Sequence, residues 1–184
     1  MGTPTPPRPV KLLVALLAKD PELFSRATTA LESSHGTADL ESEVFSWTPT
    51  TYYQKEMGDH LLRKFVAFPS LITPEAITQI KQETNSLEIS FSEGGSPTSP
   101  RRVNLDPGYI DATKLVLAST KPQAHRIYLN DGIYAEVTLL YHHGQFHPFL
   151  YTYADYRWPG TQKFLHRVRV RYLTQLRDHG SRRE

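Results

Sequence analysis

An apolar run near the N-terminus constrains the fold more than any other feature of the sequence. It spans Val10–Ala18 and reads VKLLVALLA. The run is short, and Pro9 and Asp20 lie close to its two ends, which favours a strand over a helix. Because neither face of such a strand is polar, we expect it to be buried on both faces.

Two helices are predicted to begin with the same local chemistry. Asp20, Pro21 and Glu22 read as an N-cap, a first helical residue and a first-turn acid, and Gly36 ends that helix. Thr73-Pro74-Glu75 repeats the pattern. Apolar residues then recur at helical spacing in both segments: Leu23, Phe24, Ala27, Ala30 and Leu31 in the first, and Ile77, Ile80, Leu87 and Phe91, with Thr84 among them, in the second.

The order of elements predicts an α+β fold. Strands are expected in or near DLESEVFSW (39–47), LLRKFVAF (61–68) and RRVNL (101–105), and EGGSPTSP (93–100) has the composition of a flexible loop. Together with the first strand and the two helices, they give the order βαββαβ. This is the sequence form of a ferredoxin-like unit, a four-stranded antiparallel sheet with two helices on one face. The fold alone does not indicate a function, because proteins with this fold have many different functions.

Further elements are predicted to extend this unit. Asp111 could cap a short helix, ATKLVLAST (112–120), that Lys121-Pro122 would end. HRIYL (125–129) and IYAEVTLLY (133–141) are predicted to form a β-hairpin, and FHPFLY (146–151) an edge strand. Residues 161–177 have the pattern of an amphipathic C-terminal helix with a basic outer side.

The register of the hairpin can be predicted from its side chains. A three-residue loop at 130–132 would place Leu129 opposite Ile133 and Ile127 opposite Ala135, so that apolar and polar faces separate. Arg126 would then lie opposite Glu136, and Tyr128 opposite Tyr134. It would also place His125 opposite Val137, on the face away from Glu136. A two-residue loop would instead place Ile127 beside Glu136 and mix the two faces.

Composition sets the boundaries and excludes several protein classes. We expect tails at 1–9 and 179–184 around one domain at 10–178. Cysteine is absent, which excludes disulfide scaffolds, zinc ribbons, thiol nucleophiles and iron–sulfur clusters. No apolar run approaches the ~20 residues that cross a bilayer, so we expect a cytoplasmic protein without a membrane partner. The net charge of +2 is too small to indicate nucleic acid.

The stretch VNLDPGYI, residues 103–110, is either an ordinary turn or the rim of a site. As a β-turn, Asp106 would accept backbone N–H groups, Pro107 would fix φ and Gly108 would adopt a positive φ. The many polar residues nearby favour a site. Lys114 would lie in the first turn of the short helix, where a cation opposes the helix dipole unless it binds an anion; the alternative is a lysine in solvent.

These residues define a candidate binding site for a small molecule. It combines the 104–109 stretch with residues of the following segments and of the loops that could cover them: Asn104, Asp106, Tyr109, Lys114, Lys121, Arg126, Glu136, Tyr53, Glu56 and Asp155. The motifs GxxxxGK[ST], GxGxxG, HExxH and GxSxG are absent, and no cofactor is predicted. No metal is predicted either, because Glu136 is expected to face away from His125.

Five segments, TYYQKEMG, RRVNLDPGY, KLVLAST, AHRIYLNDGIYAEVTL and TYADYR, occur in this order. With them the chain resembles a bacterial family known as domain of unknown function 4416, from Lys11 to Leu176. The resemblance implies small standalone bacterial proteins. It implies no activity, substrate or catalytic residue.

Two functional hypotheses follow. In the first, the candidate site binds an anionic small molecule that carries phosphate or carboxylate, nucleotides included, with or without catalysis. In the second, the protein is a binding module that uses the basic face of the last helix, with Lys163, Arg167 and Arg171, for RNA or an acidic protein. The oligomeric state is not predicted.

Overall fold

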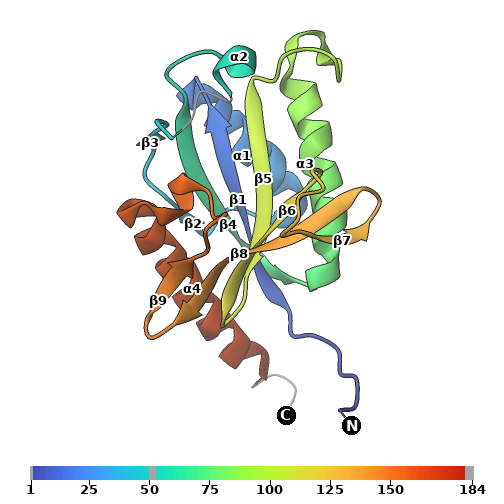
Figure 1. Ribbon diagram of the computed structural model, residues 1–184, viewed down its shortest axis with the longest axis vertical. Helices are drawn as coiled ribbons and strands as arrows, with labels where there is room; N and C mark the ends of the chain where they lie inside the picture. Colours follow the sequence, from blue (N-terminus) through green and yellow to red (C-terminus); the bar gives the residue numbers. More distant parts are fainter. Residues whose placement is uncertain (1, 50–52, 181–184) are drawn as a thin grey trace.

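A single antiparallel sheet forms the centre of the protein (Figure 1). The computed structural model describes residues 2–49 and 53–180. Its strands are β1 (Val10–Ala18), β2 (Leu40–Glu41), β3 (Phe45–Ser46), β4 (Leu62–Ile72), β5 (Val103–Ile110), β6 (Lys114–Ser119), β7 (Ile127–Asn130), β8 (Ile133–His142) and β9 (Gln145–Pro148). They follow the spatial order β2-β4-β1-β5-β6-β8-β7, while β3 pairs with β4 and β9 pairs with β8.

The helices begin largely where the sequence predicts. The described α-helices are α1 (Pro21–His35), α2 (Gln54–Met57), α3 (Ile77–Phe91) and α4 (Pro159–Gly180), with 3-10 turns η1 (Pro74–Ala76), η2 (Glu93–Gly95) and η3 (Ala154–Arg157). The Asp20 side chain accepts the Glu22 N–H at 2.8 Å, which confirms the predicted N-cap of α1.

Helices cover both faces of the sheet, which explains the apolar first strand. Leu12, Val14 and Leu16 of β1 pack in one core with side chains of α1 and α3. Leu13 and Ala15 point the other way and share a second core with α4. Every residue of β1 is buried, as predicted, because helices lie on both of its faces.

The α+β class is confirmed, and the sheet is larger than the predicted four strands. The additional strands β6, β7, β8 and β9 continue the sheet beyond β5. The predicted short helix at 112–120 is wrong: Lys114–Ser119 is strand β6, which lies between β5 and β8. Asp111 accepts the backbone N–H groups of Thr113 at 2.6 Å and Lys114 at 2.8 Å. A tight turn and a helix N-cap share this local pattern, so the side chain alone could not distinguish them.

The hairpin of β7 and β8 has two of the predicted pairs but a different loop. Ile127 pairs with Ala135 and Tyr128 with Tyr134, as predicted. Asn130, and not the predicted Leu129, pairs with Ile133, so the loop is the two residues Asp131 and Gly132, both with positive φ. An irregularity between Tyr128 and Asn130 shifts the register by one residue, which keeps the other two pairs despite the shorter loop.

The Asp106-Pro107-Gly108 stretch is not a turn. All three residues lie inside β5, where Asp106 pairs with Ala15 and Pro107 with Val14 of β1. The expected positive φ of Gly108 is also wrong. Glycine is required there for space, since a Cβ atom would lie 2.5 Å from the Val116 carbonyl oxygen of β6.

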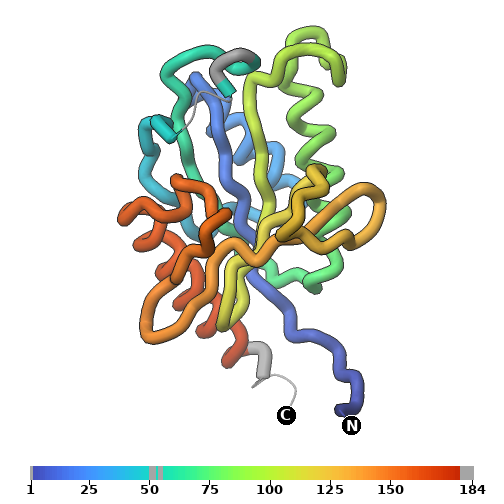
Figure 2. Tube along the Cα trace, in the orientation of Figure 1, coloured from blue at the N-terminus to red at the C-terminus, as the bar shows by residue number. Residues whose placement is uncertain are grey.

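The two ends of the described chain lie at the same end of the molecule (Figure 2). The Tyr172 hydroxyl of α4 donates to the Pro9 carbonyl at 2.9 Å, just before β1. Helix α4 continues through the predicted start of the C-terminal tail to Gly180, and residues 181–184 lie outside the described residues, as does Met1. In residues 2–49 and 53–180, no helix combines the length and apolar character that a membrane span requires.

The crowding at Gly108 gives a direct test of the β5–β6 packing. We expect Gly108→Ala to lower the free energy of unfolding by about 2 kcal/mol, because the added methyl group meets backbone that cannot move aside. Urea unfolding would measure the change. Gly2→Ala is the control, since nothing lies within 4 Å of its position. Equal stability of the two variants would contradict this packing.

Candidate functional site

The sheet splits between β5 and β6. These strands pair only from Gly108 to Ile110, so the first half of β5 has no strand on that side. The Leu105 backbone is satisfied there by two side chains of α3. Its N–H donates to Glu88 Oε1 at 2.6 Å, and its carbonyl accepts from Lys81 Nζ at 2.8 Å. Backbone groups two residues apart on a strand face the same side, so the Pro107 nitrogen also faces the open side. Proline has no N–H, and no neighbouring strand is present there to accept one.

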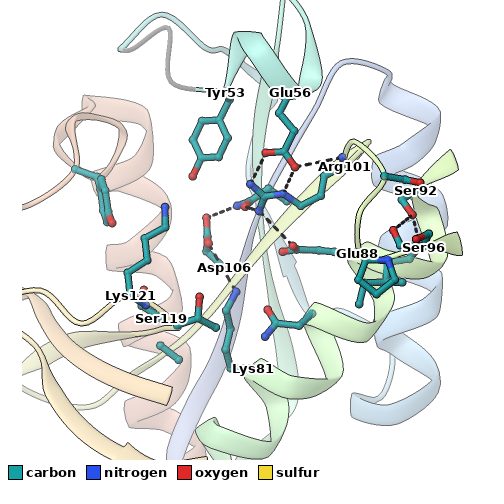
Figure 3. Close-up of a pocket in the computed structure, with 18 residues that line it drawn as sticks. Tyr53, Glu56, Lys81, Glu88, Ser92, Ser96, Arg101, Asp106, Ser119 and Lys121 are labelled. Carbon is teal, nitrogen blue, oxygen red and sulfur yellow. Dashed lines mark hydrogen bonds and ion pairs between the residues drawn. The ribbon is translucent and has the colours of Figure 1, made fainter. Parts of the chain in front are cut away.

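A polar cleft of about 300 Å³ occupies the space between the separated strands (Figure 3). Side chains of α3, β5, β6 and the loops around them line it. Its lining includes Tyr53, Glu56, Lys81, Glu88, Ser96, Ser99, Arg101, Asn104, Asp106, Ser119, Thr120 and Lys121. We call this space the polar cleft.

One wall of the polar cleft is a chain of hydrogen bonds between charged and amide groups. Arg101 donates to both carboxylate oxygens of Glu56 at 2.7 Å, and to Asn104 Oδ1 at 2.7 Å. Asn104 Nδ2 in turn donates to Asp106 Oδ2 at 2.7 Å. The bonds from Arg101 hold the pKa of Glu56 below its usual value. Glu56 and Arg101 therefore stay ionised together at neutral pH.

Asp106 lies at the inner end of this chain and still faces solvent. Its side chain is 28% exposed, with Arg63 Nη1 at 3.5 Å and Lys81 Nζ at 4.0 Å. Arg63 is almost fully buried and also contacts Asp155 of η3, with 2.9 Å between Nε and Oδ2. Asp155 is buried behind Arg63, and burial raises its pKa against the opposing charge of Arg63.

Three side chains from distant segments meet in the middle of the polar cleft. Figure 3 shows the Tyr53 hydroxyl, the Lys121 ammonium and the Asp106 carboxylate pointing toward one another. Burial, followed by the nearby charge of Asp106, raises the pKa of Tyr53. The phenol therefore stays protonated at neutral pH and can donate a hydrogen bond, while Asp106 can accept one and Lys121 can hold a negative charge.

A second space adjoins the polar cleft. This aromatic hollow has a volume of about 400 Å³ and is lined mainly by Trp47, Tyr53, Arg63, Leu117, His125, Arg126, Glu136, Tyr151, Tyr153 and Tyr156. Asp106, Ser119 and Lys121 border both spaces, as do Tyr53 and Tyr153.

The hairpin contributes a buried ion pair to the aromatic hollow. Arg126 Nε donates to Glu136 Oε2 at 2.8 Å, and both side chains are at most 3% exposed. Arg126 also donates to Ser119 Oγ and to the Tyr153 hydroxyl, each at 2.7 Å. The expectation that His125 faces away from Glu136 is wrong, because His125 precedes β7 and its Nε2 lies 3.1 Å from Glu136 Oε2.

The structure brings most of the predicted site residues together. Seven line one of the two spaces or both: Tyr53, Glu56, Asn104, Asp106, Lys121, Arg126 and Glu136. Asp155 does not line either space, but it pairs with Arg63, which does. Residues 51 and 52 of the TYYQKEMG segment lie outside the described residues.

Tyr109 and Lys114 do not belong to this site. Tyr109 packs against the core with α1 and α3, because alternation along β5 puts it on the face opposite to Asn104 and Asp106. Lys114 is in a strand rather than at a helix N-terminus, and its ammonium contacts Asp111. Hydrogen bonds from Lys114 and Thr113 outweigh the effect of burial and lower the pKa of Asp111.

Four residues of the site were not predicted from the sequence: Arg63, Lys81, Glu88 and Arg101. Lys81 and Glu88 had a detectable signal, since both are buried on α3 with Ile77 and Thr84, at spacings of four, three and four residues. Two charged residues on the buried stripe of a helix indicate polar partners there. In residues 2–49 and 53–180, no three His, Asp or Glu side chains form a group suited to a metal ion.

The fold and the site define an α+β protein whose antiparallel sheet splits around a polar cleft. Residues 8–172 of the 184-residue chain match a family model described as "Domain of unknown function (DUF4416)". The chain therefore belongs to this family, as its sequence resemblance indicates. Comparisons with curated proteins and with solved structures found no match.

The position of Glu88 predicts a pH dependence of stability. Burial raises its pKa above the ordinary 4.5, against the opposing charge of Lys81. The folded state then binds this proton more tightly than the unfolded state, so the free energy of unfolding falls as pH rises from about 4.5 through the raised pKa. Glu88→Gln keeps an acceptor for the Leu105 N–H but has no proton to lose, so it lacks this contribution.

Urea unfolding across that pH range would measure the effect. The stability of wild type minus that of Glu88→Gln should decrease as pH rises, with Glu43→Gln at an exposed position measured in parallel as the control. A difference for Glu88→Gln that is flat or increases with pH would show that burial does not control this carboxyl.

The Arg126–Glu136 pair predicts a non-additive mutational effect. Arg126→Met should cost about 3 kcal/mol of stability, because it leaves the Glu136 carboxylate buried without its strongest partner. Adding Glu136→Gln should recover part of that loss, because the charge left unpaired is removed. A double-mutant cycle by urea unfolding checks this, and strictly additive losses would contradict a coupled buried pair.

Proposed function

We propose that this protein binds a small molecule with a phosphate or carboxylate group in the polar cleft, nucleotides being among the candidates. The observation that carries the proposal is the meeting of Tyr53, Asp106 and Lys121, from three distant segments, in one cleft (Figure 3). A concave space with a few converging polar groups is the usual form of a ligand site.

The distribution of charge supports an anionic group on the ligand. Two carboxylates of the cleft are already held by the protein, Glu56 by Arg101 and Glu88 by the Leu105 N–H. Lys121 places an ammonium group on the same cleft, and Lys81 adds a second positive charge although one of its N–H groups is used on the Leu105 carbonyl. Hydroxyl groups of Ser96, Ser99, Ser119 and Thr120 add donors that phosphate or carboxylate oxygens can accept from.

Asp106 adds a requirement on the rest of the ligand. A carboxylate accepts hydrogen bonds and repels anions. We therefore expect the ligand to carry a hydroxyl or N–H group that donates to Asp106, close to the anionic group that Lys121 and Lys81 hold.

The basic face of α4 gives less support to RNA or an acidic protein as the partner. Lys163 and Arg167 are exposed, but Arg171 donates to Asp39 at 3.2 Å. The neighbouring Arg169 donates to the Ala112 carbonyl at 2.9 Å and lies over the Tyr141 ring. Part of this basic surface is therefore engaged within the protein.

We also infer that the first part of the chain is a ferredoxin-like unit that carries the site at its edge. The order β2-β4-β1-β5 supports this, since the second, third, first and fourth strands of a βαββαβ unit lie side by side. In this view β6 to β9 are an addition to the unit, and the polar cleft lies at the join.

Thermal unfolding with added anions tests the proposed function. The probes are inorganic phosphate, pyrophosphate, citrate and the ribonucleoside monophosphates. We expect at least one to raise the melting temperature, since a ligand at a hundred times its Kd adds about 2.7 kcal/mol of stability. Titration calorimetry then gives the Kd for that probe.

Two variants and one control locate the binding. Lys121→Gln and Asp106→Asn should each weaken binding by about tenfold, which corresponds to ~1.4 kcal/mol. Lys163→Gln on α4 should leave the Kd unchanged. The proposal fails if no anion shifts the melting temperature, or if Lys163→Gln weakens binding as much as Lys121→Gln.

A further inference from the structure

The aromatic hollow is not needed to hold an anion, yet it opens onto the polar cleft. Tyr53, Asp106 and Lys121 border both spaces, so one molecule can extend from one into the other. The two spaces differ in chemistry, since the polar cleft is lined largely by charged residues and hydroxyl groups, whereas the hollow adds the rings of Trp47, His125, Tyr151 and Tyr156.

The walls of the aromatic hollow are formed by packed rings. On one side the rings of Trp47 and Tyr53 meet edge to face, with their centroids 5.8 Å apart. On another side His125 stacks on Tyr151 with centroids 4.2 Å apart, and Phe149 stacks parallel to Tyr151 at 5.1 Å. Aromatic surfaces of this kind bind flat unsaturated rings better than flexible chains.

One buried polar group of the hollow has no hydrogen-bond partner. This is the Tyr156 hydroxyl, which makes no hydrogen bond within the described part of the chain; Tyr156 is 1% exposed and lines the hollow. Arg63, which also lines the hollow, is held by ion pairs with Asp155 and Asp106 at 2.9 and 3.5 Å.

A buried polar group without a hydrogen-bond partner is rare in a folded protein, and beside a cavity a ligand that pairs with it explains it. A phenol hydroxyl can donate and accept a hydrogen bond. A hydrocarbon ring would leave the Tyr156 hydroxyl unsatisfied. A ring with nitrogen or carbonyl oxygen acceptors on its edge would satisfy it.

We propose, on the basis of the proposed function, that the ligand has two parts. A phosphate- or carboxylate-bearing arm lies in the polar cleft. A flat heteroaromatic ring lies in the aromatic hollow, with its acceptor edge toward the Tyr156 hydroxyl. The ligand class is therefore a heteroaromatic ring joined to an anionic arm through a hydroxylated or N–H-bearing linker.

Binding measurements with matched probes test the two-part ligand. Ribose 5-phosphate supplies the arm without a heteroaromatic ring; the four ribonucleoside monophosphates and pyridoxine 5′-phosphate supply an arm with different heteroaromatic rings. We expect at least one ring-bearing probe to bind about tenfold or more tightly than ribose 5-phosphate, by calorimetry on the full chain.

Tyr156→Phe removes the unpaired hydroxyl and keeps the ring. It should weaken the best ring-bearing probe by about fivefold to tenfold and leave ribose 5-phosphate unchanged. Tyr172→Phe is the matched control, because Tyr172 is equally buried and its hydroxyl is used on Pro9, away from both spaces. It should change the Kd of no probe.

The outcomes separate this inference from the proposed function. If ribose 5-phosphate binds and no ring adds affinity, or if Tyr156→Phe weakens ring-bearing and ring-free probes alike, the two-part ligand is wrong while the anion site stands. If none of the probes binds, the proposed function fails and the inference fails with it.

Discussion

The site depends on one set of hydrogen bonds, in which two side chains of α3 take the place of a neighbouring strand beside β5. Glu88 and Lys81 satisfy the N–H and carbonyl of Leu105, which would otherwise be buried and unpaired where β6 leaves β5. Without them the first half of β5 would need a strand beside it, and that strand would fill the polar cleft. Pro107 and Gly108 mark where regular pairing ends, one because it lacks an N–H and the other because β6 approaches too closely for a side chain.

Buried charges then attach the later segments of the chain to this opening. Arg63 of β4 lies between Asp155 of η3 and Asp106 of β5, so the segment before α4 is held against the sheet by opposite charges. Arg126, just before β7, pairs with Glu136 of β8 and donates to Ser119 of β6 and to Tyr153, so it joins the hairpin to these segments. Each of these groups is costly to bury unless it is paired. The same pairs that close the fold therefore fix the charged groups around the two spaces.

The sequence predicted the elements that depend on local chemistry. The buried first strand and the N-cap at Asp20 follow from runs of neighbouring residues, and both are observed. The Asp106-Pro107-Gly108 stretch and the 112–120 segment were misinterpreted, because the same residues suit a turn or cap when no distant strand is considered. Their conformation is decided by pairing with β1 and β8, far away along the chain.

Most of the candidate site was within reach of the sequence, since polar residues crowded around one stretch converge in space. Tyr109 was misplaced because a strand alternates its faces, whereas a turn would have brought it beside Asp106. Amide chemical shifts during a titration with inorganic phosphate give the decisive test of an anion site beside β5. We expect saturable shifts centred on Leu105, Ser119 and Lys121. Shifts centred on 163–171 of α4, or no saturable shift, would contradict it.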